Sequence, residues 1–164
     1  MTDDIDHELA HLREEVSPCF QCGTCAGGCP VFKALGIFNP RMIFERILLE
    51  GPEVFLGNNL LWHCSVCYTC SVRCPQGIDV AHVLIALKNL AVKLNYAPES
   101  IVGEVNAIMT AGATVPLSKP VERKRKQLGL PTLPVMNIDE YEKILKSTGA
   151  VGAVTSISSQ KENQ

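Results

Sequence analysis

The chain has 164 residues, of which 46% are hydrophobic, a fraction typical of a folded protein and not of a disordered one. Its 15 basic and 17 acidic residues give a formal charge of −2, which argues against a general nucleic-acid binder. Because the N-terminal segment is acidic and no run is apolar enough to span a membrane, we expect a cytoplasmic protein without membrane insertion.

Segments with helical periodicity make up most of the chain. The first runs from Asp3 to Glu15, where apolar residues recur at helical spacing. A second helix starts at Asn39-Pro40, because Asn is a preferred N-cap and Pro a preferred first residue, and Gly51-Pro52 ends it. The apolar face predicted for this second helix consists of Met42, Ile43, Ile47 and Leu48.

Two further helices are predicted in the middle of the chain. The third begins near Asp79 and ends before Pro98, and the fourth runs from Glu99 to about Ala111. Since strand signals are weak throughout, we expect a mainly α fold. The buried face predicted for the third helix consists of Val80, Val83, Leu84, Leu87, Leu90, Ala91 and Leu94.

The character of the sequence changes after Gly112. A short basic helix is predicted from Pro120 to Leu128 and a last helix from Asp139 to Lys146. From Gly149 the residues are small and polar, which is typical of a flexible tail. We therefore expect a domain over 1–112, a Pro-punctuated docking extension over 113–148 and a flexible tail over 149–164. The prolines of the extension are Pro116, Pro120, Pro131 and Pro134.

The basic run of this extension has two interpretations. It contains Lys119, Arg123, Lys124, Arg125 and Lys126. A run of this kind is commonly a solvated helix face, and it is also able to contact an acidic partner. Because the surrounding segment is too apolar for a free linker, we favour a segment that lies along a partner protein.

All eight cysteines fall in two runs that repeat with an offset of 64 − 19 = 45 residues. Each run reads C-x2-C-x2-C-x3-C-P. In the cytosol such cysteines are metal ligands more often than disulfides. The first run contains Cys19, Cys22, Cys25 and Cys29, and the second contains Cys64, Cys67, Cys70 and Cys74.

This spacing predicts two [4Fe–4S] clusters with crossed ligation. Three cysteines on a tight loop can bind three irons of one cubane, and in two-cluster ferredoxins the fourth cysteine binds the other cluster. One predicted ligand set is therefore Cys19, Cys22, Cys25 and Cys74, and the other is Cys64, Cys67, Cys70 and Cys29. A structural zinc site is the alternative, but four cysteines within eleven residues fit the usual zinc pairs poorly.

The wider context of the cysteines carries a family resemblance. A helix is predicted between the two runs, and in this respect the chain resembles the α-helical ferredoxin domain. Small bacterial ferredoxins differ, because they have β-hairpins between their cysteine runs. The segments P-C-F-Q-C-G-T-C at 18–25 and W-H-C-S-V-C-Y-T-C at 62–70 resemble the C subunit of the soluble heterodisulfide reductase of methanogenic archaea. The sequences N-P-R at 39–41, Q-G-I-D at 76–79 and L-G-L-P at 128–131 fit that family too. The resemblance covers roughly residues 10–148.

The resemblance implies an electron-relay protein within a larger complex. It implies two partners: one of the A type, which carries flavin and iron–sulfur groups, and one of the B type, which reduces the coenzyme M–coenzyme B disulfide. Neither the C-C-G run of the B type nor the G-x-G-x-x-G flavin fingerprint of the A type occurs here, so we expect no catalytic residue and no substrate site.

Two questions stay open at this point. Helical ferredoxin domains also occur in succinate, glycolate and anaerobic glycerol dehydrogenases, and similar C subunits occur in sulfur metabolism. A relay subunit of another soluble oxidoreductase is therefore the alternative function. His63, next to Cys64, either donates a hydrogen bond to a cluster sulfur or packs as an ordinary side chain.

Overall fold

The computed structural model describes residues 2–115, 117–133 and 137–162, and it divides into two compact units, Met1–Tyr96 and Ala97–Gln164. All elements of these described ranges are helices, which confirms the mainly α prediction. The boundary after Tyr96 precedes the end at residue 112 that we expected for the first domain. Pro116 and Pro134, like the last two residues of the predicted tail, lie outside the described residues.

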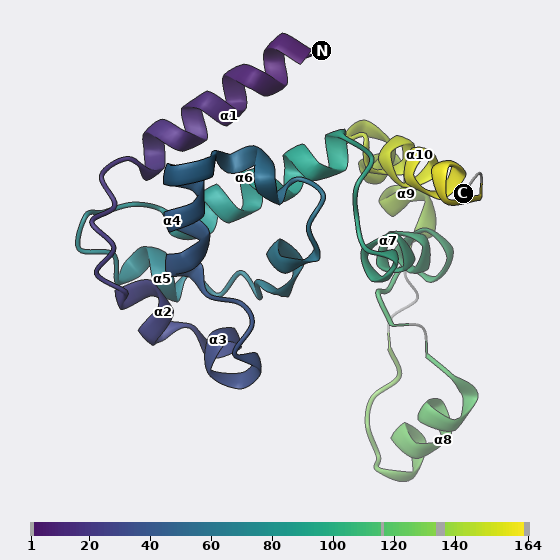
Figure 1. Cartoon of the computed structure of the whole chain (residues 1–164). Helices are drawn as coiled ribbons and strands as arrows, with labels where there is room; N and C mark the ends of the chain where they lie inside the picture. Colours follow the sequence, from purple (N-terminus) through teal and green to yellow (C-terminus); the bar gives the residue numbers. More distant parts are fainter. Residues whose placement is uncertain (1, 116, 134–136, 163–164) are drawn as a thin grey trace. The chain divides into compact units, whose positions relative to one another are not determined.

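Three longer helices form the frame of the first unit. They are α1 (Thr2–Val16), α4 (Pro40–Glu50) and α6 (Val80–Lys93), close to the predicted ranges (Figure 1). Helix α1 packs against both α4 and α6, and the short 3-10 helix η1 (Pro52–Phe55) packs against all three.

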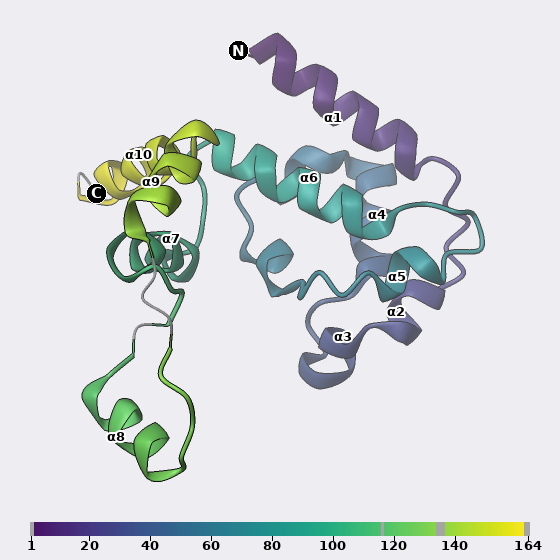
Figure 2. The ribbon, with the colours of Figure 1, turned by 180° about the vertical axis from the view of Figure 1, so that it is seen from behind.

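Short helices connect this frame with the cysteine runs. They are α2 (Thr24–Gly28), α3 (Pro30–Leu35), the 3-10 helix η2 (Asn59–His63) and α5 (Thr69–Val72), and the sequence patterns did not predict them. Helix α2 lies against α5 and α4, and α5 lies against α6, as the view from behind also shows (Figure 2). The two cysteine runs are therefore brought side by side although 45 residues separate them.

Side-chain caps fix where the two helices after the cysteine runs begin. The Asn39 side-chain oxygen accepts hydrogen bonds from the backbone N–H of Arg41 at 3.1 Å and of Met42 at 3.3 Å. The Asp79 carboxylate accepts one from the backbone N–H of His82 at 3.1 Å and another from the Ser71 hydroxyl at 2.6 Å. These bonds satisfy N–H groups that lack a partner within the helix. The second Asp79 bond also ties α6 to α5.

The buried faces differ from the predicted ones at three residues. Met42 is 50% exposed and Leu94 is 46% exposed, whereas Phe44, which the pattern did not select, is buried. The core side of α4 is centred on Ile43, Phe44 and Ile47, which turns Met42 outward. Helix α6 ends at Lys93, so its periodicity no longer directs Leu94 to the core.

The second unit packs three helices around a small core. Helices α7 (Glu99–Ala111), α9 (Ile138–Ser147) and α10 (Ala150–Glu162) contact one another in pairs. Helix α10 occupies a segment that we expected as a flexible tail. Val154 and Ile157 stand three residues apart on it and are buried, so a narrow apolar stripe holds this helix against its neighbours.

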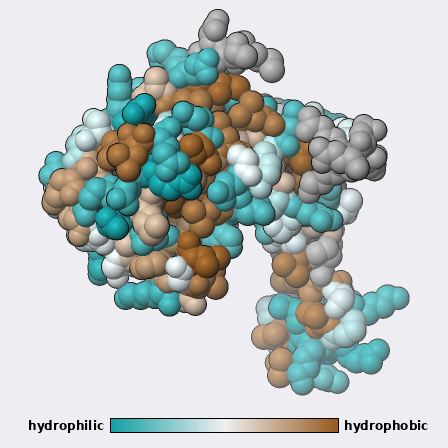
Figure 3. Space-filling model, viewed as in Figure 1, coloured by the Kyte–Doolittle hydropathy of each residue, from teal (hydrophilic) through white to brown (hydrophobic). Residues whose placement is uncertain are grey.

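Helix α8 (Lys119–Gln127) has a different character, because none of its residues is buried. It matches the basic helix predicted between the prolines of the extension. Hydrophilic and apolar side chains lie together on its surface (Figure 3). In the described part of the chain, no helix has the length and apolar character needed to cross a bilayer.

The buried face of α6 gives a direct test of this packing. Replacing the fully buried Leu87 with Ala should lower the free energy of unfolding by about 2–5 kcal/mol, because it leaves a cavity among tightly packed side chains. Urea unfolding of the iron-loaded protein measures this change. The matched control is Leu49→Ala, since Leu49 is 76% exposed and its loss should cost under about 0.5 kcal/mol. Equal effects of the two substitutions would contradict the assigned core.

Candidate metal centre

The eight cysteines line two pockets, four cysteines to each. We call them the Cys19 pocket and the Cys64 pocket. Each pocket takes three cysteines from one run and the fourth from the other, so the structure brings together both predicted sets. The Cys19 pocket contains Cys19, Cys22, Cys25 and Cys74, and the Cys64 pocket contains Cys29, Cys64, Cys67 and Cys70.

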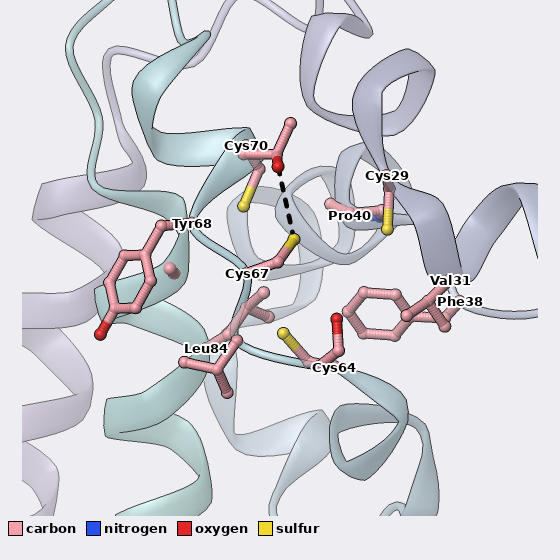
Figure 4. Close-up of a pocket in the computed structure, with 13 residues that line it drawn as sticks. Cys29, Val31, Phe38, Pro40, Cys64, Cys67, Tyr68, Cys70 and Leu84 are labelled. Carbon is pink, nitrogen blue, oxygen red and sulfur yellow. Dashed lines mark hydrogen bonds between the residues drawn. The ribbon is translucent and has the colours of Figure 1, made fainter.

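The Cys64 pocket is a space between four sulfur atoms with apolar walls. Figure 4 shows the sulfurs of its four cysteines around a common space, while the ring of Tyr68 points away from them. Phe38 and Leu84, both almost fully buried, form part of the wall. Such walls exclude water from a bound group and thereby affect its reduction potential.

Left-handed backbone turns aim the sulfurs inward at matching places in both runs. Gln21 and Gly23 have φ angles of 61° and 79°, and Val66 and Tyr68, 45 residues later, have 52° and 59°. This conformation is unusual for bulky residues, above all for a β-branched Val. Its presence in both runs shows that the loop geometry, and not the local residue preference, decides the backbone here.

The first turns of two helices form the wall between the pockets. At the start of α4, Pro40 lines the Cys64 pocket and the next residue, Arg41, lines the Cys19 pocket. At the start of α6, Val80 lines the Cys19 pocket and Ala81 lines the Cys64 pocket. The two capped helix starts therefore set the separation of the two sulfur groups.

One exposed cysteine in each pocket has a hydroxyl partner. Cys22 Sγ lies 3.3 Å from Thr24 Oγ1, and Cys67 Sγ lies 3.5 Å from Thr69 Oγ1. The threonine hydroxyl, followed by backbone hydrogen bonding, lowers the pKa of Cys22 and the pKa of Cys67. Since the thiolate is the form of cysteine that binds metals, a lowered pKa makes these two thiols more available as ligands.

The third cysteine of each run is in the opposite situation. Burial raises the pKa of Cys25 to about 11, and burial also raises the pKa of Cys70. A metal that bound such a thiol would displace its proton. Four sulfur donors around each pocket fit the ligand set of a [4Fe–4S] cluster.

The distribution of the sulfurs bears on the kind of metal group that each pocket could hold. No three His, Cys, Asp or Glu side chains of the described residues are grouped to hold a single metal ion. A cubane takes each thiolate on a different iron, so its four ligands stand around the cluster and not around one point. The arrangement of each pocket agrees with this requirement.

Other side-chain and backbone groups contact the cysteines, and the spacing of the cysteine motif did not predict these contacts. The Gln21 amide donates to Cys19 Sγ at 3.4 Å, and the Arg41 guanidinium donates to the Gln21 oxygen at 3.4 Å. The backbone N–H of Phe32 donates to Cys29 Sγ at 3.4 Å. Thr24 and Thr69 were recognisable from the sequence, because the 45-residue offset places them at the same point of both runs.

Lys88 and His63 lie close to Cys64, and each contacts a backbone carbonyl oxygen there. The Lys88 ammonium donates to the Cys64 carbonyl oxygen at 3.1 Å and stands 5.7 Å from the centre of the Trp62 ring. Burial lowers the pKa of Lys88. His63 Nδ1 lies 3.2 Å from the carbonyl oxygen of Asn59, a contact within its own short helix η2.

Comparison with known proteins gives a consistent family assignment. A family model described as a 4Fe-4S dicluster domain matches residues 15–78. The C subunit of the ferredoxin:CoB-CoM heterodisulfide reductase of Methanosarcina mazei is 32% identical over 151 residues, which cover 92% of each chain. The iron-sulfur C subunit of the CoB-CoM heterodisulfide reductase of Methanopyrus kandleri is 30% identical over 137 residues, which cover 80% of this chain and 71% of the relative.

Proposed function

The chain belongs to the family of C subunits of CoB-CoM heterodisulfide reductases, and we propose that it relays single electrons through two [4Fe–4S] clusters. One cluster is held by Cys19, Cys22, Cys25 and Cys74, and the other by Cys29, Cys64, Cys67 and Cys70. The single observation that carries this proposal is the division of the cysteines into two pockets, each with three ligands from one run and one from the other.

The proposed role is electron transfer without catalysis on this chain. All eight cysteines line the two pockets, so cluster binding uses every thiol that would otherwise attack a disulfide. Exposed Cys22 and Cys67 bring one corner of each cluster to the surface, where a partner's redox group can approach. The starts of α4 and α6 each contribute neighbouring residues to both pockets, which keeps the clusters adjacent for transfer between them.

The proposed partners follow from the relatives. Their names describe subunits of reductases that act on the CoB-CoM heterodisulfide, with ferredoxin named for the Methanosarcina mazei protein. We assign this chain a place between the A-type partner, which carries flavin and iron–sulfur groups, and the B-type partner, which reduces the disulfide. A reducing cytoplasm supports this role, because it keeps unligated thiols available for cluster assembly.

Docking to a partner is proposed for the segment around α8. We expected a docking extension over 113–148, but α9 packs against α7 and α10 and so belongs to the helical core of the second unit. Residues 117–133 remain, and apart from the half-buried Arg125 they are all exposed. Exposed apolar side chains accompany the basic run, namely Leu117, Val121, Leu128, Leu130 and Leu133. A partner surface with acidic residues around an apolar recess fits this segment.

A reconstitution experiment tests the relay. The iron-loaded chain, reduced with a viologen dye, should accept electrons but should not turn over the coenzyme M–coenzyme B disulfide. Addition of the A-type and B-type partners should start turnover, and omission of this chain from that mixture should stop it. The protein without iron serves as control, because it keeps the sequence and lacks the carriers. Sustained disulfide reduction by this chain alone would refute the relay role.

A further inference from the structure

One pair of equivalent residues places different chemistry beside the first cysteine of each run. In the first run Gln21 donates its amide N–H to Cys19 Sγ at 3.4 Å. The residue 45 positions later is Val66, which has the same left-handed backbone but no polar atom to offer to Cys64. At this position of the repeat, the Cys19 pocket therefore has a side chain that donates to sulfur, and the Cys64 pocket has an apolar side chain.

A guanidinium supports the Gln21 amide. Arg41 lines the Cys19 pocket and donates to Gln21 Oε1 at 3.4 Å, which orients the amide N–H toward the sulfur. Arg41 is itself fixed at the start of α4, because its backbone N–H binds the Asn39 cap.

We propose that the Gln21–Arg41 pair raises the reduction potential of the cluster in the Cys19 pocket above that of the cluster in the Cys64 pocket. A hydrogen bond to sulfur and a nearby positive charge both favour the reduced, more negative state of a cluster. If a one-electron reductant such as a reduced viologen gave up one electron to the iron-loaded chain, the Cys19-pocket cluster would hold that electron in preference to the other cluster. The inference rests on the proposed ligation of two clusters.

Other polar groups also contact the cysteines and offset part of this difference. The threonine partners of Cys22 and Cys67 are equivalent in the two pockets, and Ser65 adds a neutral side-chain hydrogen bond to Cys67. In the Cys64 pocket, the backbone N–H of Phe32 donates to Cys29 Sγ. This neutral donor matches the Gln21 amide of the other pocket but brings no positive charge. Lys88 binds a carbonyl oxygen and a ring face near Cys64 and is attracted to the Cys64 thiolate, but it is not part of the pocket lining, and burial, its larger influence, lowers its pKa. Arg41, in contrast, lines its pocket directly.

Redox titration followed by electron paramagnetic resonance tests the inference on the full iron-loaded chain. In the wild-type protein the Cys19-pocket cluster should be reduced first. At a fixed solution potential, Arg41→Met should lower the ratio of reduced to oxidised Cys19-pocket cluster at least about tenfold. For one electron this equals a fall of about 59 mV in the reduction potential of that cluster. Gln21→Val, which copies the residue of the second run, should shift it in the same direction, and Arg41→Lys should restore part of the loss.

Arg46→Met is the matched control. Arg46 lies on the same helix and, like Arg41, has a glutamate partner four residues later, at 2.8 Å from Glu50. It lines neither cysteine pocket, so its removal should change both potentials far less. Equal shifts from Arg41→Met and Arg46→Met, or earlier reduction of the Cys64-pocket cluster in the wild type, would overturn the inference. An iron content below that of two clusters would instead refute the proposed function on which it rests.

Discussion

Replacement of Cys74 with Ala is expected to remove or alter the cluster held by Cys19, Cys22 and Cys25 and to leave the other cluster intact. Cys74 belongs to the second run, but it lines the pocket of the first. Iron content should therefore fall from about eight toward about four per chain. The remaining paramagnetic signal should match that of a Cys22→Ala protein and differ from that of a Cys67→Ala protein.

Double substitutions make this test independent of any spectral assignment. Cys22→Ala combined with Cys74→Ala should keep one cluster, because both residues line the same pocket. Cys67→Ala combined with Cys74→Ala should lose both clusters, because these residues line different pockets. If the second pair keeps a cluster and the first pair does not, ligation stays within each run and the crossed assignment is wrong.

Neutralisation of α8 is expected to release the chain from its complex while both clusters remain. Lys124→Gln combined with Lys126→Gln removes two exposed positive charges from the proposed docking segment. Affinity for the partner proteins should fall roughly tenfold at low ionic strength, and the difference from wild type should shrink as salt screens the charges. Co-purification and titration calorimetry with the partner proteins measure this change.

A second pair of lysines provides the control for α8. Lys143→Gln combined with Lys146→Gln removes the same charge from α9 of the same unit. These substitutions should leave partner binding close to the wild-type value. Leu128→Ser examines the apolar part of the segment and should weaken binding at high salt as well, since burial of apolar surface is not screened. Unchanged binding in both α8 variants would assign docking to other surfaces of the chain.

Circular dichroism and iron content separate docking from folding in these variants. Lys124 and Lys126 lie in the last turn of α8, where positive charge favours the helix, so their loss should reduce helicity only slightly. None of the α8 residues is buried, so the packed helices of the second unit should be unaffected. A large fall in helix content would show that the segment contributes to folding.

The sequence by itself determined the features that depend on neighbouring residues. The cysteine spacing and its 45-residue repeat indicated clusters with crossed ligation, and the pockets contain those same two sets of cysteines. The starts of α4 and α6 followed from Asn39-Pro40 and Asp79, because a cap acts on backbone groups two or three residues away. Family membership was recognisable for the same reason, since the residues that carry it stand beside the cysteines.

Only the tertiary structure decided which other groups meet the cysteines and which weakly patterned segments become ordered. Arg41 reaches the Cys19 pocket because α4 packs against α2, and no local spacing connects it with Gln21, twenty residues earlier. Helix α10 forms where composition indicated a tail, because Val154 and Ile157 gain burial against α7 and α9. Contacts of this kind depend on how separate helices are placed in space, and burial then outweighs the weak preference of the local sequence.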